Sequence, residues 1–256
     1  MSEDVSRAGR DRLYETREPA PFVFDAAVVE VFDDMIARSV PLFAPMSVLF
    51  AELAGRTVIR ALAQTLQRNE GEAAETGSPP LLIDVGCSSG TRTQRLAEAA
   101  PMARILGIDL SPDMIAEATA ANAYPERVTY RCADAQETIP RCDVIVCSYT
   151  LQFVAPQQRL PLLRAWRDAL RPGGVLLLAE KLCAEEETQA TWIEAHEQFK
   201  RRQGYSEREI AAKRQALAGV LVPWTEQRWR EVLHEAGFTN VAPLTRWLAF
   251  ASFAVT

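Results

Sequence analysis

The stretch LLIDVGCSSGTRTQRLAEAA, residues 81–100, contains the most specific pattern in the sequence. An apolar run ends at Asp84, two glycines (Gly86 and Gly90) bracket three small or polar residues, and a helical pattern follows. A short buried strand, a glycine turn and a helix together form the first half of a strand–helix–strand unit. Because glycine lets the backbone turn tightly and approach a ligand closely, the turn is predicted to bind a ligand.

The sequence after Pro80 alternates between short apolar runs and amphipathic segments. Apolar runs separated by helices are typical of parallel strands that are buried on both faces of a sheet. Right-handed crossovers then give a doubly wound α/β sheet, whose ligand lies at the carboxyl ends of the strands. The last two runs have almost no loop between them, so we expect an antiparallel last strand. The expected strands are residues 81–85, 104–109, 127–131, 142–147, 174–180, 240–245 and 247–255, and the expected helices are residues 90–99, 112–122, 157–170 and 225–236.

Segments of different character flank and interrupt this region. The first residues are charged and contain two prolines, which is typical of a loose arm. Two amphipathic segments follow, and then a polar linker with glycine and proline. The expected divisions are a flexible arm at residues 1–21, a helical cap with its linker at 22–79 (helices at 24–40 and 46–66), and a domain at 80–256 with a charged helical insert at 181–224.

Composition disfavours several classes of protein. The net charge of −6 argues against a protein that binds nucleic acid directly through a basic face. The five cysteines form no CxxC pair and lie far from both histidines, so no metal site is expected. An odd number of cysteines without a signal peptide favours a reducing, cytoplasmic compartment. No apolar run approaches the ~20 residues of a membrane span, so no membrane contact is expected.

The glycine turn differs from the common phosphate-binding loops. Ser88 stands where a dinucleotide fingerprint has its middle glycine, and no Gly-Lys-Ser/Thr follows. A nucleoside with an amino-acid tail fits better: the loop N–H groups can face its carboxylate, and Asp84 can lie near its ammonium. Asp109, at the end of the second strand, can accept both ribose hydroxyls, and Asp134, after the third, can accept from an adenine amine. Taken singly, these acids have structural alternatives: Asp84 as the end of a strand, Asp109 as a partner of a helix cap and Asp134 as a loop residue.

Several motifs resemble those of the class I S-adenosylmethionine-dependent methyltransferases, over about residues 80–255. They are LLIDVGCSSG, the acid Asp109, CADAQ, CDVIVCSYTLQFV and LRPGGVLLLAEK. The resemblance implies a Rossmann-like sheet of seven strands with an antiparallel last strand, and S-adenosylmethionine as cofactor. Together with the narrower resemblance described next, which covers Phe43, Leu110 and Ser148, it implies cofactor contacts at Phe43, Asp84, Gly86, Cys87, Ser88, Gly90, Asp109, Leu110, Asp134, Ala135 and Ser148.

A narrower resemblance spans nearly the whole chain beyond residue 22. The segments FDAAVVEVFDDMIARSVPLF, GCSSG, TLQFV, LLLAEK and FKRRQGYSEREIAAKR are similar to those of the carboxy-S-adenosylmethionine synthases. That family carboxylates the sulfonium methyl of S-adenosylmethionine with carbon dioxide from prephenate, and phenylpyruvate leaves. The resemblance implies a homodimer whose product, carboxy-S-adenosylmethionine, serves a separate enzyme that modifies the tRNA wobble uridine.

The insert supplies the expected catalytic residue. Arg201 lies at the position of the family arginine that holds the added carboxylate across the dimer, and a guanidinium can do so with two hydrogen bonds. By composition alone, Arg201 and its neighbours could equally form a solvated helix face. Tyr205 and Arg38 are expected in the wall of the substrate pocket. His196 is a weaker candidate for a general base than for an ordinary helix residue.

Three positions depart from the family pattern. Phe43 replaces a tyrosine, and Leu110 and Ser148 each replace an asparagine. Binding of the nucleoside should survive these changes, but they leave the chemistry open. The alternatives are a methyltransferase acting on a small molecule, as in secondary metabolism, and a non-catalytic module that binds S-adenosylmethionine.

Overall fold

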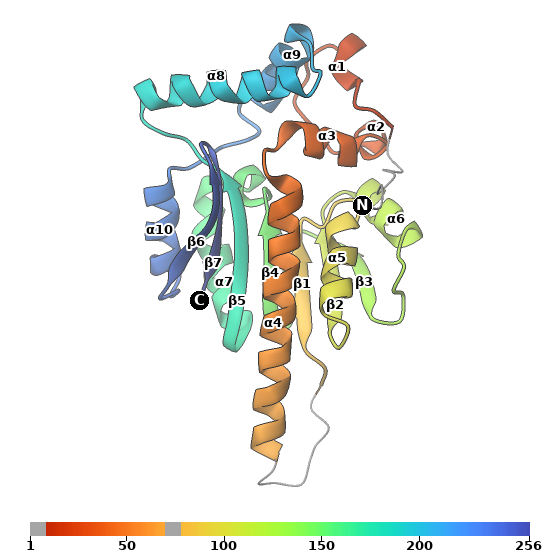
Figure 1. Ribbon diagram of the computed structural model, residues 1–256, viewed down its shortest axis with the longest axis vertical. Coiled ribbons are helices and arrows are strands. Elements are labelled where there is room, and N and C mark those ends of the chain that lie inside the picture. The colour runs from red at the N-terminus through yellow and green to blue at the C-terminus, as the bar shows by residue number, and fades with distance from the viewer. Residues whose placement is uncertain (1–8, 70–77) are drawn as a thin grey trace.

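The computed structural model describes residues 9–69 and 78–256. Its centre is a seven-stranded sheet in the order β3-β2-β1-β4-β5-β7-β6 (Figure 1). Strands β1 to β5 are parallel, and β7 runs antiparallel to both β5 and β6. The strands are β1 Leu81–Val85, β2 Arg104–Asp109, β3 Val128–Cys132, β4 Cys142–Ser148, β5 Leu170–Lys181, β6 Val241–Trp247 and β7 Phe250–Val255.

Helices cover both faces of the sheet because apolar residues alternate along its strands. Leu82 belongs to the core beneath α4 and α5, whereas its neighbour Ile83 belongs to the core beneath α7 and α10. Val144 and Ile145 divide in the same way, as the twofold period of a strand requires. The helices of these two layers are α4 Phe43–Asn69, α5 Thr91–Ala99, α7 Pro156–Ala169 and α10 Glu226–Glu235, and α6 Pro112–Ala120 packs beside β2 and β3.

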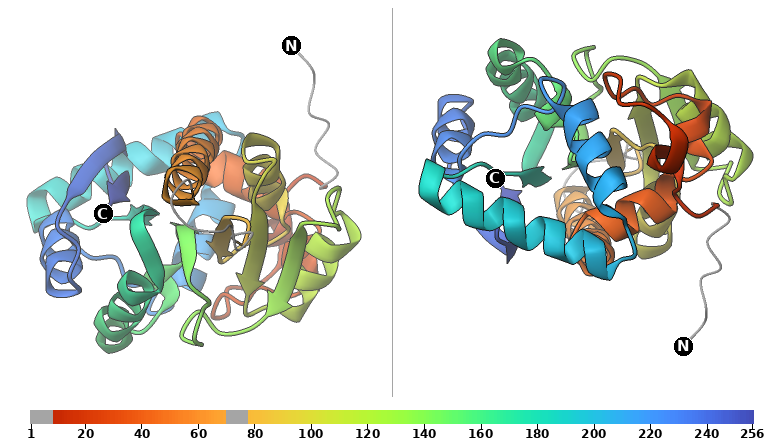
Figure 2. Two further views of the ribbon diagram at one scale, coloured as in Figure 1. Left: turned by 90° about the horizontal axis from the view of Figure 1, so that it is seen from below. Right: turned by 90° about the horizontal axis from the view of Figure 1, so that it is seen from above.

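A third layer of helices lies over the carboxyl ends of the parallel strands (Figures 1 and 2). It combines the beginning of the chain with the insert between β5 and α10. Tyr14, Phe22, Val28 and Phe32 form an apolar cluster there together with Ala216. The members of the layer are α1 Leu13–Thr16, α2 Ala26–Val29, α3 Phe32–Ser39, α8 Glu186–Arg202 and α9 Glu207–Leu217; a short 3-10 helix, Leu151–Phe153, follows β4 beneath it.

The predicted sheet, with its seven strands and antiparallel last strand, is confirmed. The helix expected over 24–40 is instead divided into α2 and α3. Asp25 caps α2 by accepting from the Val28 N–H, and the β-branched valines around the break favour helix poorly. Helix α4 begins at Phe43, three residues earlier than expected, and extends below the sheet in Figure 1.

The expected loose arm is anchored to the rest of the protein at two buried residues. Residues 1–8 lie outside the described residues, but Asp11 and Tyr14 are buried. The linker expected before residue 80 lies largely within 70–77, which is also outside the described ranges. Within those ranges, no single helix is long and apolar enough to cross a membrane. Helices α3 and α4 reach the necessary length and apolar composition only when taken together, and they are bent by 101° relative to each other.

Candidate active site

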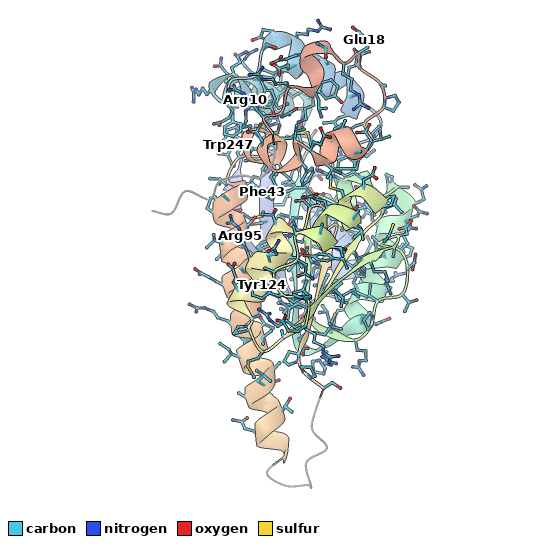
Figure 3. The ribbon with its side chains drawn as sticks, turned by 90° about the vertical axis from the view of Figure 1, so that its right-hand side faces the viewer. Arg10, Glu18, Phe43, Arg95, Tyr124 and Trp247 are labelled. Atoms are coloured by element: carbon cyan, nitrogen blue, oxygen red, sulfur yellow. The ribbon has the colours of Figure 1, made fainter. Side chains whose placement is uncertain are left out.

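A cavity of about 720 Å³ lies between the carboxyl ends of the strands and the upper layer of helices. The loops after β1, β2, β3 and β4 form its floor, and residues of the cap and the insert form its roof. Phe43, at the start of α4, lies at the junction of the two parts (Figure 3). The candidate residues that line the cavity are Phe43, Gly86, Cys87, Ser88, Asp109, Leu110, Asp134, Ala135 and Ser148.

The glycine turn is held in a strained but well-supported shape. Gly86, Ser88 and Gly90 all have positive φ angles. A Cβ atom on Gly86 would lie 2.1 Å from Thr150 Oγ1, so only glycine fits there. The Gly86 and Cys87 N–H groups donate to Ile108 O, and the Ser88 N–H donates to Asp109 Oδ2 over 3.0 Å. These three N–H groups already have partners within the protein. They are therefore not free for the carboxylate of a ligand, which differs from the expectation from the sequence.

Asp84 does not line the cavity, because β1 carries it into the interior. Its Oδ1 accepts from Arg92 Nη2 at 2.5 Å and its Oδ2 from Thr93 Oγ1 at 2.7 Å. Arg92 also donates to Gly86 O and forms part of the cavity wall. Burial lowers the pKa of the Arg92 guanidinium, but the charge and hydrogen bonds of Asp84 raise it by more, so the net effect is a raised pKa. The expected contact between Asp84 and a ligand is thus replaced by an arginine that the sequence analysis missed.

Asp109 keeps the position that the sequence predicted. Its two carboxylate oxygens accept from the backbone N–H groups of Ser88 and Ser111, and each retains a free lone pair. Desolvation raises the pKa of Asp109, although these two hydrogen bonds act in the opposite direction. Asp134, in the loop after β3, accepts from the Gln136 backbone and side chain. Both acids therefore reach the cavity with capacity for further donors.

Two small side chains complete the floor. The Ser148 hydroxyl is buried and has no hydrogen-bond partner within the described part of the chain, so it is free to bond a polar atom of a ligand. Burial, reinforced by Asp84 and Asp109, raises the pKa of the Cys87 thiol, so this residue lines the cavity as a neutral group. Gly90 lies beneath the turn against Tyr130 and does not line the cavity.

Hydrogen bonds fasten the cap to the floor. Asp33, on α3, accepts from Ser89 Oγ and Thr91 Oγ1, both at 2.8 Å. Ser111 Oγ donates to Phe24 O at 2.8 Å. The cap is therefore attached to the loops after β1 and β2, so the cavity has a roof in this single chain.

The sequence contains three lysines, Lys181, Lys200 and Lys213, and all three line the cavity. They come from β5, α8 and α9, so the fold brings them together from distant segments. Burial and their mutual repulsion lower the pKa of Lys200 to about 7, and burial lowers that of Lys213 to about 8. His196 also lines the cavity: burial and Lys200 lower its pKa to about 3, and its Nε2 lies 2.8 Å from Ser39 O. From the sequence, a cationic insert was expected above this site, but its functional cation was placed at Arg201 and these lysines were not singled out.

The three residues predicted for the substrate lie outside the cavity wall. Arg38 donates to the backbone oxygens of Asp11 and Gln203 and stacks on Tyr205. Tyr205 donates to Asp11 Oδ2 at 2.5 Å. These two residues join the beginning of the chain to the insert instead of forming a pocket wall, because their polar atoms already have partners.

Arg201 lies on the outward side of α8. Its Nε and Nη2 donate to the carboxylate of Glu207 at 2.5 and 2.9 Å, and Glu197 lies 3.5 Å away. The guanidinium does not line the cavity of its own chain, and its role at a partner's cavity stays a prediction. Among the residues of 9–69 and 78–256, no cluster of three or more metal-ligating side chains occurs.

The loop after β4 rests on a buried acid. Glu180, on β5, accepts from the backbone N–H groups of Leu151 and Gln152 at 3.0 Å. Desolvation raises its pKa to about 8. Glu180 thereby fixes the segment that follows Ser148 at the cavity floor.

Comparison with known proteins agrees with this geometry. The family model for the methyltransferase domain matches residues 82–174. The carboxy-S-adenosyl-L-methionine synthase of Wolinella succinogenes is 37% identical and covers 95% of this chain and 97% of its own length. That of Campylobacter curvus is 36% identical, with 95% and 98% covered, and that of Marinobacter nauticus is 38% identical, with 90% and 88% covered.

Solved structures share the fold at lower identity. Human N-acetylserotonin methyltransferase, solved with its cofactor SAM, superposes with a TM-score of 0.54 at 15% identity, covering 90% of this chain and 55% of that one. The methyltransferase SibL superposes with a TM-score of 0.51 at 21% identity, with 77% and 56% covered. The chain thus spans just over half the length of these two structures, which support the fold alone. The near full-length relatives, in contrast, show that this chain belongs to the carboxy-S-adenosyl-L-methionine synthase family.

Proposed function

We propose that this chain is a carboxy-S-adenosyl-L-methionine synthase, an enzyme that binds S-adenosylmethionine and carboxylates its sulfonium methyl with carbon dioxide from prephenate. One observation carries the proposal: a single cavity has the acids Asp109 and Asp134 in its floor and all three lysines of the sequence in its roof. Acids suit the hydroxyl and amine donors of a nucleoside, and lysines suit a substrate with two carboxylates.

The floor fits the cofactor. Asp109 has lone pairs for both ribose hydroxyls, and Asp134 can accept from the adenine amine. The unpartnered Ser148 hydroxyl supplies a further polar contact, and Phe43 supplies an apolar one. Bound S-adenosylmethionine supplies an electrophilic sulfonium whose methyl hydrogens are acidified by the positive sulfur.

The roof fits a dianion. Lys213 Nζ lies 3.6 Å from Asp11, so part of its charge is already balanced. Lys181 and Lys200 have no carboxylate partner in the part of the chain that the structure describes. Two uncompensated cations in a buried cavity match the two carboxylates of prephenate.

We also propose that the enzyme acts as a homodimer in the cytoplasm. Arg201 is placed away from its own cavity, on the outer side of α8, where it could enter the cavity of a second copy after leaving Glu207. The product would serve a separate tRNA-modifying enzyme, so no contact of this chain with nucleic acid is needed.

Methyl transfer to a small molecule is the second candidate. It is favoured by Phe43 and Leu110, which lack the polar groups of the family residues at the cavity. Mass spectrometry of the ligand that copurifies with the protein separates the two. A cofactor heavier than S-adenosylmethionine by one carbon dioxide supports the synthase, and S-adenosylhomocysteine alone supports the methyltransferase.

A further inference from the structure

Arginine is far more common than lysine among the cationic residues of this chain. Lysine and arginine number 28, of which 25 are arginines, so lysine occurs only at the three cavity positions. A guanidinium stays protonated at any working pH, whereas a buried amine can release its proton. The three lysines can therefore supply the cavity with charge and also with a transferable proton, whereas an arginine would supply charge alone.

The three amines have different partners. Lys213 Nζ donates to Ser39 Oγ at 3.1 Å and lies near Asp11. Lys181 Nζ lies 5.9 Å from the ring centre of Phe250. Lys200 is buried, and throughout the described ranges its side-chain Nζ has neither a hydrogen bond nor an ion pair. A substrate can therefore meet this amine without displacing a hydrogen-bond or ion-pair partner.

Several charged and titratable groups face Lys200. Burial is the largest influence, followed by Lys213 on α9 and Lys181 on β5, with Glu197 on α8 acting in the opposite sense and Arg214 on α9 acting with the lysines. Together they lower its pKa to about 7, close to the value at which an acid–base group works best near neutrality. His196 is unsuited to this task because its pKa is lowered to about 3.

Helix geometry separates Lys200 from its neighbour. Adjacent residues on an α-helix project about 100° apart, so Lys200 can line the cavity while Arg201 faces outward. Two successive cations of α8 thus take two separate positions. One is inside the cavity of its own chain, and the other is available at the surface.

We propose that Lys200 moves the protons of the reaction, first donating one to the oxygen that leaves the dicarboxylate and then accepting one from the sulfonium methyl. This rests on the proposed function. As the ring carboxylate leaves as carbon dioxide, its bonding electrons enter the ring, the ring becomes aromatic, and hydroxide departs. Lys200 protonates that hydroxide to water and becomes a neutral amine. The amine then takes a methyl proton as the electron pair of the C–H bond forms the new bond to carbon dioxide, which restores the ammonium.

The variant Lys200→Arg tests this step, because it keeps the charge and removes the transferable proton. We expect kcat to fall about 100-fold or more while KM for the dicarboxylate stays within about threefold. The acid–base role also predicts that kcat/KM of the wild type falls as the pH rises through about 7, because the ammonium is the form that must act first. A kcat of Lys200→Arg within about threefold of the wild type would overturn the proposal.

A direct titration supplies a readout that does not depend on turnover. Protein labelled with [ε-¹³C]lysine has three lysine resonances, one for each cavity lysine. One resonance should titrate near pH 7 and be missing from Lys200→Arg. The control Arg202→Lys places a lysine on an exposed position of the same helix and should add a resonance that titrates near ~10.4, with unchanged turnover. A Lys200 resonance that also titrates above ~9 would overturn the proposal.

The same experiments distinguish failure of the proposed function from failure of the role proposed for Lys200. Wild-type protein that makes no carboxylated product from S-adenosylmethionine and prephenate contradicts the proposed function and this proposal with it. Wild-type protein that makes the product, together with an equally active Lys200→Arg, contradicts the role of Lys200 alone.

Discussion

Arg92 Nη2 lies 2.5 Å from Asp84 Oδ1, and both side chains are buried beneath the first loop of the cavity. The same guanidinium donates to Gly86 O at 3.1 Å. The pair therefore connects the acid at the end of β1 to the turn that follows it. The ion pair matters for stability only while both of its charges are present, because either charge left alone would be buried without compensation.

Removing the arginine should destabilise the protein strongly. Arg92→Met leaves the Asp84 carboxylate buried without its main partner, and we expect the free energy of unfolding to drop by about 3 to 5 kcal/mol. Urea denaturation measures this drop, with the exposed Glu98→Gln on the same helix as a control that changes stability by less than about 0.5 kcal/mol. The double variant Asp84→Asn/Arg92→Met should be more stable than Arg92→Met alone. A double variant that is less stable would contradict the pairing.

Asp109 should control affinity for the nucleoside. Asp109→Asn replaces one charged acceptor by an amide donor, so we expect the Kd for S-adenosylmethionine to rise about 10- to 100-fold. Isothermal titration calorimetry provides the measurement. The control Asp113→Asn, on the exposed first turn of α6, should leave the Kd unchanged. Affinity of Asp109→Asn within about twofold of the wild type would show that the acid does not hold the ribose.

Much of the fold and floor could be predicted from the sequence because both depend on local pattern. The alternation around Ile83 marks the strands. Asp109 and Ser148 end strands and Asp134 follows one, and the carboxyl ends of these strands meet at one edge. The roof depends instead on how a distant helix turns toward the sheet. Periodicity alone does not show whether Lys200 or Arg201 faces inward, nor that Arg38 lies outside the cavity wall. The scarcity of lysine was a signal that could have found the roof.

Lys200 should cost the protein stability in a way that depends on pH. Its pKa is about 7 in the folded chain and ~10.4 in an unfolded one, so between these values the unfolded chain binds more protons and stability rises with pH. Lys200→Met removes the buried ammonium and should be about 2 to 4 kcal/mol more stable than the wild type at pH 6. Urea denaturation from pH 6 to 10 should show this advantage shrinking. An advantage that is constant with pH would be at odds with a lowered pKa.

Arg201 can be tested by mixing two inactive variants. If Arg201 acts in the cavity of the partner, a dimer of one Lys200→Arg chain and one Arg201→Ala chain contains one intact site. Random exchange of subunits should then restore about a quarter of the wild-type activity per site. Assays before and after refolding of a mixture measure the recovery. A mixture that stays inactive, although size-exclusion chromatography shows mixed dimers, would argue that Arg201 does not act across the interface.

The central claim is that the acidic floor and the lysine roof serve one carboxylation. The most direct measurement is mass spectrometry of the products formed when the purified protein is incubated with S-adenosylmethionine and prephenate. We predict a cofactor heavier by one carbon dioxide, formed in equal amount with phenylpyruvate. Recovery of unaltered S-adenosylmethionine and prephenate, or of S-adenosylhomocysteine with a methylated acceptor, would contradict the account.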